Sequence, residues 1–111
     1  MSMILPGEPI VIDDEEITVY KKLWVGPDYV CSLMYFYKWN LGENISSRES
    51  IELTENEIET GMIQEGFHFY LEPQDDDENT TVVEMKVKKE DIVAVGFYMG
   101  QLSLVAMKAV F

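Results

Sequence analysis

The sequence contains little cysteine, little histidine and few basic residues, and each shortage excludes a class of protein. The single cysteine, Cys31, cannot form an internal disulfide, whereas small secreted domains usually carry several bridges. Eight lysines and arginines stand against 21 acids. The resulting net charge of −13 argues against nucleic acid or an anionic membrane as a direct partner, because both are negatively charged. We therefore expect a cytoplasmic protein that binds neither.

Long apolar segments are also absent. The longest uninterrupted apolar run, residues 33–37, is far shorter than the ~20 residues that span a bilayer. The first 16 residues hold five acids and no basic start ahead of an apolar run, so we expect no signal peptide. At 111 residues, of which 47% are apolar, the chain is sized for a single domain over residues 1–111 with one core. Residues 1–9 contain two prolines and a glycine, which predicts an irregular lead-in.

The chain does contain alternating apolar and polar residues, which predict strands. The alternation is clearest over residues 81–88, where one face is apolar and the other is charged. Residues 17–39 predict a hairpin with its turn at Gly26-Pro27-Asp28, and Lys21 falls on the apolar side of its first arm. Other predicted strands cover residues 10–12, 51–53, 67–71, 92–95 and 101–111.

One short helix is indicated between these strands. Thr54 followed by Glu57 has the spacing of a capping box and predicts one or two helical turns that end at Gly61. Residues 89–91 and 96–100 predict turns between the last strands. The expected fold class is mainly β, with a curved antiparallel sheet or half-barrel and one or two short helices.

The only histidine, His68, lies in the strand predicted over residues 67–71. On an alternating strand His68 shares one face with Tyr70, whereas the phenylalanines on either side share the other face. A pKa near neutrality suits a general base or a ligand, and Glu65 or Glu84 could supply a carboxylate. No serine lies in a recognisable nucleophile elbow. The favoured interpretation is a structural histidine that bonds a carbonyl or a carboxylate, and a site at His68 and Tyr70 is the alternative.

A metal site is not expected. Asp75, Asp77 and Asn79 occupy the first, third and fifth positions of a calcium-loop pattern. Thr80 stands where that pattern needs glycine, and Lys86 stands where it needs glutamate, so this is not an EF-hand. Cys31 has no second cysteine or nearby histidine at the spacing of a zinc site. We predict no cofactor and no metal, and we predict that residues 74–79 form a solvated acidic loop.

The acidic surplus points instead to a protein partner with a basic surface. The net charge exceeds the magnitude of roughly 2 to 8 that solubility requires in a small domain, and the excess causes self-repulsion. Such a surface is attracted to basic grooves, including grooves that normally hold nucleic acid. The aromatic residues of the hairpin either pack on both faces of the sheet or form an exposed docking patch. The predicted partner-binding residues are Glu55, Glu57, Glu59, Asp75, Asp76, Asp77, Trp24 and Trp39.

The order of several short motifs resembles a loose group of small, uncharacterised phage and bacterial modules. Their shared layout is vYK…YxxG…GFHay followed by two strands. Here residues 19–21 read VYK, residues 37–42 read YKWNLG and residues 66–70 read GFHFY. The similarity covers roughly residues 17–110. The resemblance implies a small β-rich fold and an origin in a phage or other mobile element, and it implies no reaction.

Three functions are therefore open. The leading hypothesis is a non-enzymatic, acidic protein-binding module that inhibits a host nucleic-acid-binding or defence protein by charge mimicry. The second is a small enzyme or ligand-binding domain centred on His68 and Tyr70. The third is a homo-oligomeric structural protein joined by edge pairing through its final strand, which ends in Val110 and Phe111.

Overall fold

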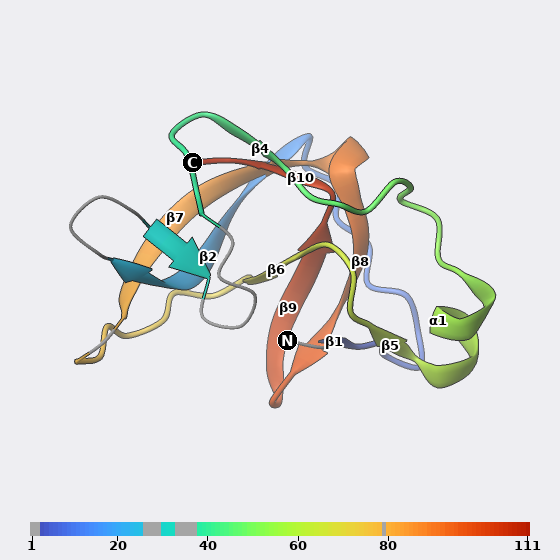
Figure 1. Cartoon of the computed structure of the whole chain (residues 1–111). Helices are drawn as coiled ribbons and strands as arrows, with labels where there is room; N and C mark the ends of the chain where they lie inside the picture. Colours follow the sequence, from blue (N-terminus) through green and yellow to red (C-terminus); the bar gives the residue numbers. More distant parts are fainter. Residues whose placement is uncertain (1–2, 26–29, 33–37, 79) are drawn as a thin grey trace.

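The described residues form one antiparallel sheet that is strongly curved (Figure 1). The structure is a computed structural model, and it describes residues 3–25, 30–32, 38–78 and 80–111. Hydrogen-bonded neighbours run in the order β4-β10-β7-β2-β6-β9-β8-β1-β5, and β3 pairs with β2 beside this path. The elements are β1 (Met3–Ile4), β2 (Glu16–Val25), β3 (Val30–Ser32), β4 (Glu43–Ile45), α1 (Glu55–Thr60), β5 (Met62–Ile63), β6 (Phe67–Tyr70), β7 (Thr81–Lys88), the 3-10 turn η1 (Lys89–Asp91), β8 (Ile92–Tyr98), β9 (Gln101–Ala106) and β10 (Lys108–Val110). The predicted fold class, mainly β with short helices, is confirmed.

The longest pairing joins β2 to β7 over eight residue pairs. Both strands alternate as predicted: Val19 and Leu23 on β2, and Met85 and Val87 on β7, are buried in the core. Apart from Lys21, which shares the core side with Val19 and Leu23, the charged and polar residues of the two strands face outward, because successive side chains of a strand point to opposite sides of the sheet. The predicted strands over residues 17–25 and 81–88 are therefore confirmed.

The predicted hairpin is present where the structure describes it. Strand β3 runs antiparallel to the end of β2, with Leu23 opposite Ser32 and Trp24 opposite Cys31. The predicted turn at residues 26–28, and residues 33–37 of the predicted second arm, lie outside the described residues.

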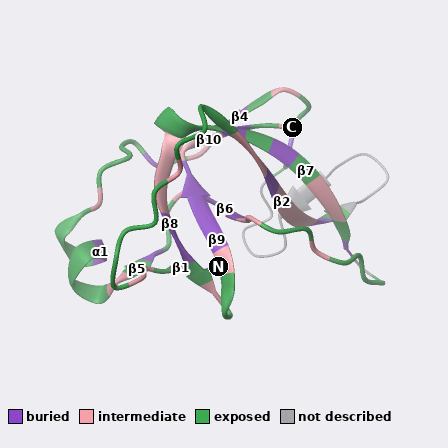
Figure 2. Cartoon of the chain, turned by 180° about the vertical axis from the view of Figure 1, so that it is seen from behind, coloured by how far each residue is buried: buried purple, intermediate pink, exposed green. Residues whose placement is uncertain are grey.

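The concave side of the sheet holds the main hydrophobic core, which appears in Figure 2 as the buried segments on β2, β6, β7 and β9. Phe69 and Leu104 lie in it with no solvent exposure. The ring centroid of Trp39 is 4.5 Å from that of Phe67 and 5.9 Å from that of Phe69. Trp39 is only 5% exposed, so its prediction as a partner-binding residue is wrong. A strongly curved sheet needs large side chains to fill its interior, and Trp39 is one of them.

A smaller second core lies on the other side of β9. It contains Met3, Ile63 and Val105, and none of the three is exposed to solvent. The prediction of an irregular lead-in over residues 1–9 is wrong at Met3–Ile4, because β1 pairs there with both β5 and β8. This close approach depends on Gly96, where a Cβ atom would lie 2.3 Å from the backbone oxygen of Ile4. Residues 10–12, predicted as a strand, form none.

The C-terminal strands also differ from expectation. Strand β8 continues to Tyr98, and Met99 and Gly100 form the hairpin turn with φ angles of 48° and 78°, as a two-residue type I′ turn requires. The last predicted strand is divided at Met107 into β9 and β10. Strand β10 lies between β4 and β7, so the chain's end is not a sheet edge. Edge pairing through Val110 and Phe111 is therefore excluded as a route to oligomers.

In residues 43–61 the structure confirms one prediction and differs from the sequence analysis at two places. Helix α1 has the predicted capping box, with reciprocal hydrogen bonds between Thr54 and Glu57, and it ends at Gly61 with a φ of 68°. Strand β4 was not expected from the sequence, and residues 51–53 form a loop in place of the predicted strand. Strand β4 is held only by its pairing with β10, which no local pattern reveals.

Candidate functional site

The loop between β6 and β7 carries one of two runs of four exposed acids, and the other is residues 13–16, which lead into β2. Residues 75–78 are all exposed. The Asp76 carboxylate accepts a hydrogen bond from the backbone N–H of Val82 at 2.7 Å, and the Asp77 carboxylate accepts one from that of Thr80 at 3.0 Å. The N–H of Asp77 donates to the Thr80 carbonyl in return, at 3.3 Å. Two of the acids therefore fix the loop that displays them, as aspartates commonly do in turns.

Trp24 lies at the same end of the sheet as this loop. Its neighbour Leu23 is opposite Thr81, the first residue of β7 after the loop. The Trp24 side chain is 40% exposed. We call residues 72–78 together with Trp24 the acidic end. Among the predicted partner-binding residues, the structure brings Asp75, Asp76, Asp77 and Trp24 together at this end.

The acids of helix α1 form a separate group. Glu55 and Glu59 are exposed, but α1 lies at the opposite side of the molecule from the β6–β7 loop (Figure 1). The molecule measures 41 Å along its longest axis. One small contact area cannot include both groups.

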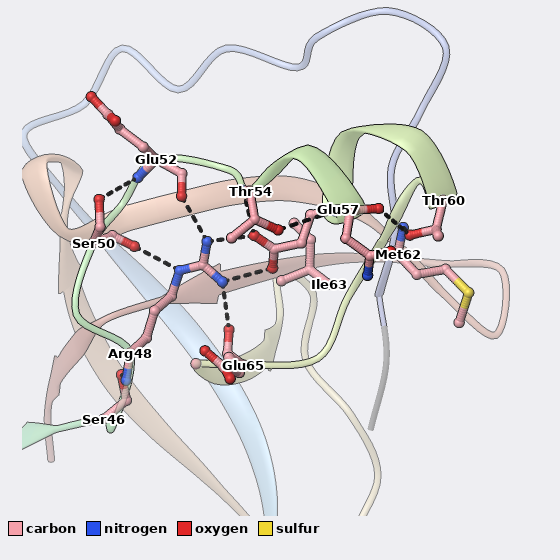
Figure 3. Close-up of polar contacts among 12 residues, drawn as sticks. Ser46, Arg48, Ser50, Glu52, Thr54, Glu57, Thr60, Met62, Ile63 and Glu65 are labelled. Carbon is pink, nitrogen blue, oxygen red and sulfur yellow. Dashed lines mark hydrogen bonds and ion pairs between the residues drawn. The ribbon is translucent and has the colours of Figure 1, made fainter.

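Glu57 is not a surface residue, so its prediction as a partner-binding residue is wrong. It is 8% exposed, and its carboxylate binds the Arg48 guanidinium through two hydrogen bonds of 2.8 Å (Figure 3). Its Oε1 atom also accepts the backbone N–H of Thr54 at 2.9 Å. The bond from Arg48 lowers the pKa of Glu57 to about 2, against the opposing effect of burial. The capping-box spacing predicted a helix start, but it could not show that the glutamate turns inward.

Arg48 is the residue that sequence reasoning missed. All five of its N–H groups have acceptors: the two Glu57 oxygens, and the backbone carbonyls of Ser50 at 2.7 Å, Glu52 at 2.9 Å and Glu65 at 3.2 Å. The bond to Glu57 raises the pKa of Arg48, which stays charged. Arg48 thus joins the loop after β4 to helix α1 and to the turn before β6. The available signal was that it is the chain's one arginine.

His68 is packed and bonded. It is 5% exposed, its Nε2 lies 2.9 Å from the Ile63 carbonyl, and its Nδ1 lies 3.2 Å from the Gly66 carbonyl. Burial lowers its pKa to about 4. The ring is therefore neutral at pH 7, and only one of its two nitrogens carries a proton to donate. His68 does lie on the opposite face of β6 from the core phenylalanines, as predicted: it is opposite Val105 of the second core.

The groups proposed to act with His68 do not gather around it. Tyr70 lies half-buried two residues away, where its ring centroid is 6.3 Å from that of Tyr98, and burial raises its pKa. Glu84 is exposed on β7 opposite Tyr20, and the side chain of Glu65 is exposed. Within the described residues, the hydrogen-bond partners of the His68 ring are two backbone carbonyls. The described residues also contain no group of three histidine, cysteine or acidic side chains placed to hold a metal ion.

Lys21 is an unusual cation on the core side of β2. Its Nζ donates to the His68 carbonyl at 2.6 Å and lies 5.5 Å from the centroid of the Phe69 ring. Burial lowers its pKa to about 8. The strand pattern placed Lys21 on the apolar side, but it did not explain why a lysine occupies a position that faces the core.

Replacing Lys21 by methionine is expected to raise the free energy of unfolding at pH 7 by about 1 kcal/mol, because a partly buried cation is removed. The unfolded chain releases the Lys21 proton near pH 10.5 and the folded chain near pH 8, so the stability of the parent protein rises with pH between these values. The difference between variant and parent should therefore shrink over this range in urea unfolding. Lys22→Met is the control, because it removes a lysine from the opposite face of β2. A Lys21→Met protein less stable than the parent at pH 7 contradicts this account.

Comparisons with known proteins add no identification. No known protein family, curated protein or solved structure matches the chain. In the part of the chain that the structure describes, no helix has the length and apolar character needed to cross a membrane.

Proposed function

We propose that this chain is a non-enzymatic protein-binding module that docks on the basic surface of a partner protein through its acidic end. The observation that carries the proposal is the run of four exposed acids at residues 75–78, on a loop fixed by two of its own carboxylates and beside the exposed Trp24. A loop that is already ordered loses little conformational entropy when it binds. Its charges attract a basic partner over the Debye length, and a tryptophan is a favoured apolar anchor at interfaces.

The partner we favour is a host protein that normally holds nucleic acid or acts in defence. Closely spaced carboxylates present negative charge as a phosphate backbone does, so a groove lined with lysine and arginine can accept them. The resemblance to phage and bacterial modules supports a bacterial host and an action in its cytoplasm. On this proposal the protein inhibits its partner by occupying the groove.

The test begins with capture from a bacterial lysate by the immobilised full-length protein, at low and at high ionic strength. The captured protein is then purified, and its dissociation constant is measured. We expect a basic protein whose dissociation constant rises at least tenfold between about 0.05 M and about 0.3 M salt. Binding that does not respond to salt contradicts the proposal.

Two matched variants locate the contact. Asp75→Asn with Glu78→Gln removes two charges from the acidic end and leaves the capping carboxylates of Asp76 and Asp77 in place. Glu55→Gln with Glu59→Gln removes two exposed charges from α1. The first pair should weaken binding several-fold more than the second. Equal losses of affinity in the two variants would show that binding depends only on the total charge, and would contradict docking through the acidic end.

The alternative of an enzyme or ligand-binding domain at His68 and Tyr70 finds less support. The His68 ring is buried and its nitrogens face backbone carbonyls, so a substrate would have to displace the β5 segment to reach it. The surface depression formed by Glu43, Lys86 and Lys108 lies on other strands. A general base must also lie within hydrogen-bond reach of the substrate proton that it accepts.

A further inference from the structure

Apolar side chains continue from the main core onto an exposed part of the sheet. Phe97 on β8 is opposite Leu102 on β9, and Leu102 packs against the main core. Ile4 on β1 is opposite both Phe97 and Met62 on β5. Side chains opposite each other on neighbouring strands lie on the same face of the sheet. We call Phe97, Ile4 and Met62 the apolar row, and it extends the face of the sheet that carries the main core.

The apolar row is open to solvent. Ile4 is 58% exposed, Met62 is 41% exposed and Phe97 is 39% exposed. They lie on the last three strands of the sheet order, β8, β1 and β5 (Figure 1). Single exposed apolar side chains are common in soluble proteins, but a contiguous group that prolongs a core face is typical of an interaction surface.

The turn after β8 adds a fourth apolar side chain at an unfavourable position. Met99 has a φ of 48° and is 82% exposed. Asparagine and glycine are favoured at this position of a type I′ turn, because other side chains are strained at positive φ. Met99 buries little of its side chain within the fold to offset that strain. Strain of this kind is typical of residues that serve binding, and methionine is common at surfaces that bind helices.

Exposed acids lie at both ends of the apolar row. At the β5 end, Glu59 precedes Thr60, whose hydroxyl accepts the Met62 N–H at 3.3 Å. At the other end, Glu72 follows the residue whose N–H donates to the Leu102 carbonyl at 3.1 Å. The described elements β1, β5, β6, β8, β9 and α1 contain no lysine or arginine. The row therefore lies in an acidic part of the molecule.

This combination defines the chemistry of a partner. An apolar centre with acids at both ends is complementary to a segment whose apolar side chains are flanked by lysine or arginine. A second copy of the chain or an anionic membrane would bring negative charge against these acids. Helix turns repeat every 5.4 Å and strands every ~4.8 Å, so apolar side chains on successive helix turns can meet successive members of the row. We infer that the apolar row and Met99 bind a basic amphipathic helix of another protein.

The strands also set the length of that helix. From β6, which leads to Glu72, to β5 the sheet spans about 19 Å at about 4.8 Å per strand. A helix of about 13 residues covers this distance and can place a basic side chain near each of the two glutamates. The contact is separate from that of the proposed function, which is tested at residues 75–78, so either can fail without the other.

The test uses a synthetic helical peptide of about 14 residues, with leucine at i, i+3, i+4 and i+7 and lysine on the remaining face. A peptide of the same composition in shuffled order, without the apolar stripe, is the control. Their dissociation constants for the full-length protein are measured by fluorescence anisotropy at about 0.15 M salt. We expect the amphipathic peptide to bind at least about tenfold more tightly. Two peptides of equal affinity would overturn the inference, because net charge alone would then explain binding.

A pair of matched variants locates the contact. The row variant carries Ile4→Gln and Met62→Gln, and its control carries Leu41→Gln and Ile45→Gln near β4, at the other end of the sheet order. Both replace two exposed apolar side chains and leave the net charge unchanged. The row variant should bind the amphipathic peptide at least about tenfold more weakly, and the control should stay within about twofold of the parent. Circular dichroism establishes that each variant is folded, and a folded row variant with the affinity of its control contradicts the inference.

Met99→Asn separates binding from folding. Asn-Gly is the preferred pair of a type I′ turn, so the thermal unfolding midpoint should rise while affinity for the amphipathic peptide falls several-fold. A variant that binds the peptide as the parent does would show that the turn lies outside the surface, against the inference.

The acids are tested by removing charge in pairs. Glu59→Gln with Glu72→Gln should weaken peptide binding more than Glu43→Gln with Glu90→Gln, which removes the same charge at exposed positions elsewhere. The same loss in both pairs would contradict a specific role for the acids beside the row. Light scattering of the protein alone tests the rival occupant. Self-association that the row variant abolishes would show that a second copy covers the row, and would refute a helix of another protein as its partner.

Discussion

Replacing Arg48 by methionine is expected to lower the free energy of unfolding by about 3–5 kcal/mol, because it leaves the Glu57 carboxylate buried without its counter-charge. The guanidinium also satisfies three backbone carbonyls that methionine cannot bond. Methionine is close in length to arginine, so the apolar part of the side chain is retained. Urea unfolding at pH 7, followed by circular dichroism, measures the change.

A double-mutant cycle separates the ion pair from the other Arg48 bonds. Glu57→Gln keeps an oxygen that can accept the N–H of Thr54, and it is expected to lower the free energy of unfolding by about 1–3 kcal/mol. In the double variant the loss should be smaller than the sum of the single losses, because no buried charge is left alone. Glu59→Gln, at an exposed position on the same helix, should change stability by less than about 0.5 kcal/mol. An Arg48→Met protein within about 1 kcal/mol of the parent would contradict a structural role for the pair.

Acidification from pH 7 to pH 4 is expected to lower the free energy of unfolding by on the order of 3 kcal/mol through His68 alone. The unfolded chain takes up the imidazole proton near pH 6.5, whereas the folded chain takes it up only near pH 4 because the ring is buried. Between these values the unfolded state binds more protons, so stability falls as the pH falls. Glu57 has a separate window, since its contribution is lost only as the pH falls from about 4.5 towards 2.

The His68→Gln variant tests this assignment. The difference in the free energy of unfolding between parent and variant should decrease as the pH is lowered from about 6.5 to 4. Comparing the two proteins removes the contribution of the many carboxylates, which both share. The imidazole proton resonances of the parent should titrate near pH 4 in NMR spectra. A titration near pH 6.5 would show that the ring is accessible, and would reopen the His68 and Tyr70 alternative.

Local patterns were enough to predict most of the long strands and the helix. The alternation in β2 and β7 arises because each strand has one buried and one exposed face. The Thr54–Glu57 spacing is typical of the start of a helix. The acidic loop was predicted because residues 75–78 cannot be buried without partners. In each case the determining contacts lie within a few residues along the chain.

The errors concern residues whose environment is set by distant parts of the chain. Met3–Ile4 forms a strand because Gly96 leaves room for its backbone. Glu57 turns inward because Arg48, nine residues earlier, reaches it with both terminal nitrogens. Trp39 is buried because β6 passes beneath it with Phe67 and Phe69. None of these pairings has a signature in the spacing of residues.

The sequence by itself determined the excess of negative charge, the β-rich class and the position of the exposed acidic loop, because these follow from composition and from near neighbours along the chain. Only the tertiary structure decided which acids remain on the surface and which aromatic rings fill the interior. Those outcomes depend on the order and register in which strands far apart in the sequence pair. The register determines which side chains share a face, and with it the distribution of charge on which the proposed binding depends.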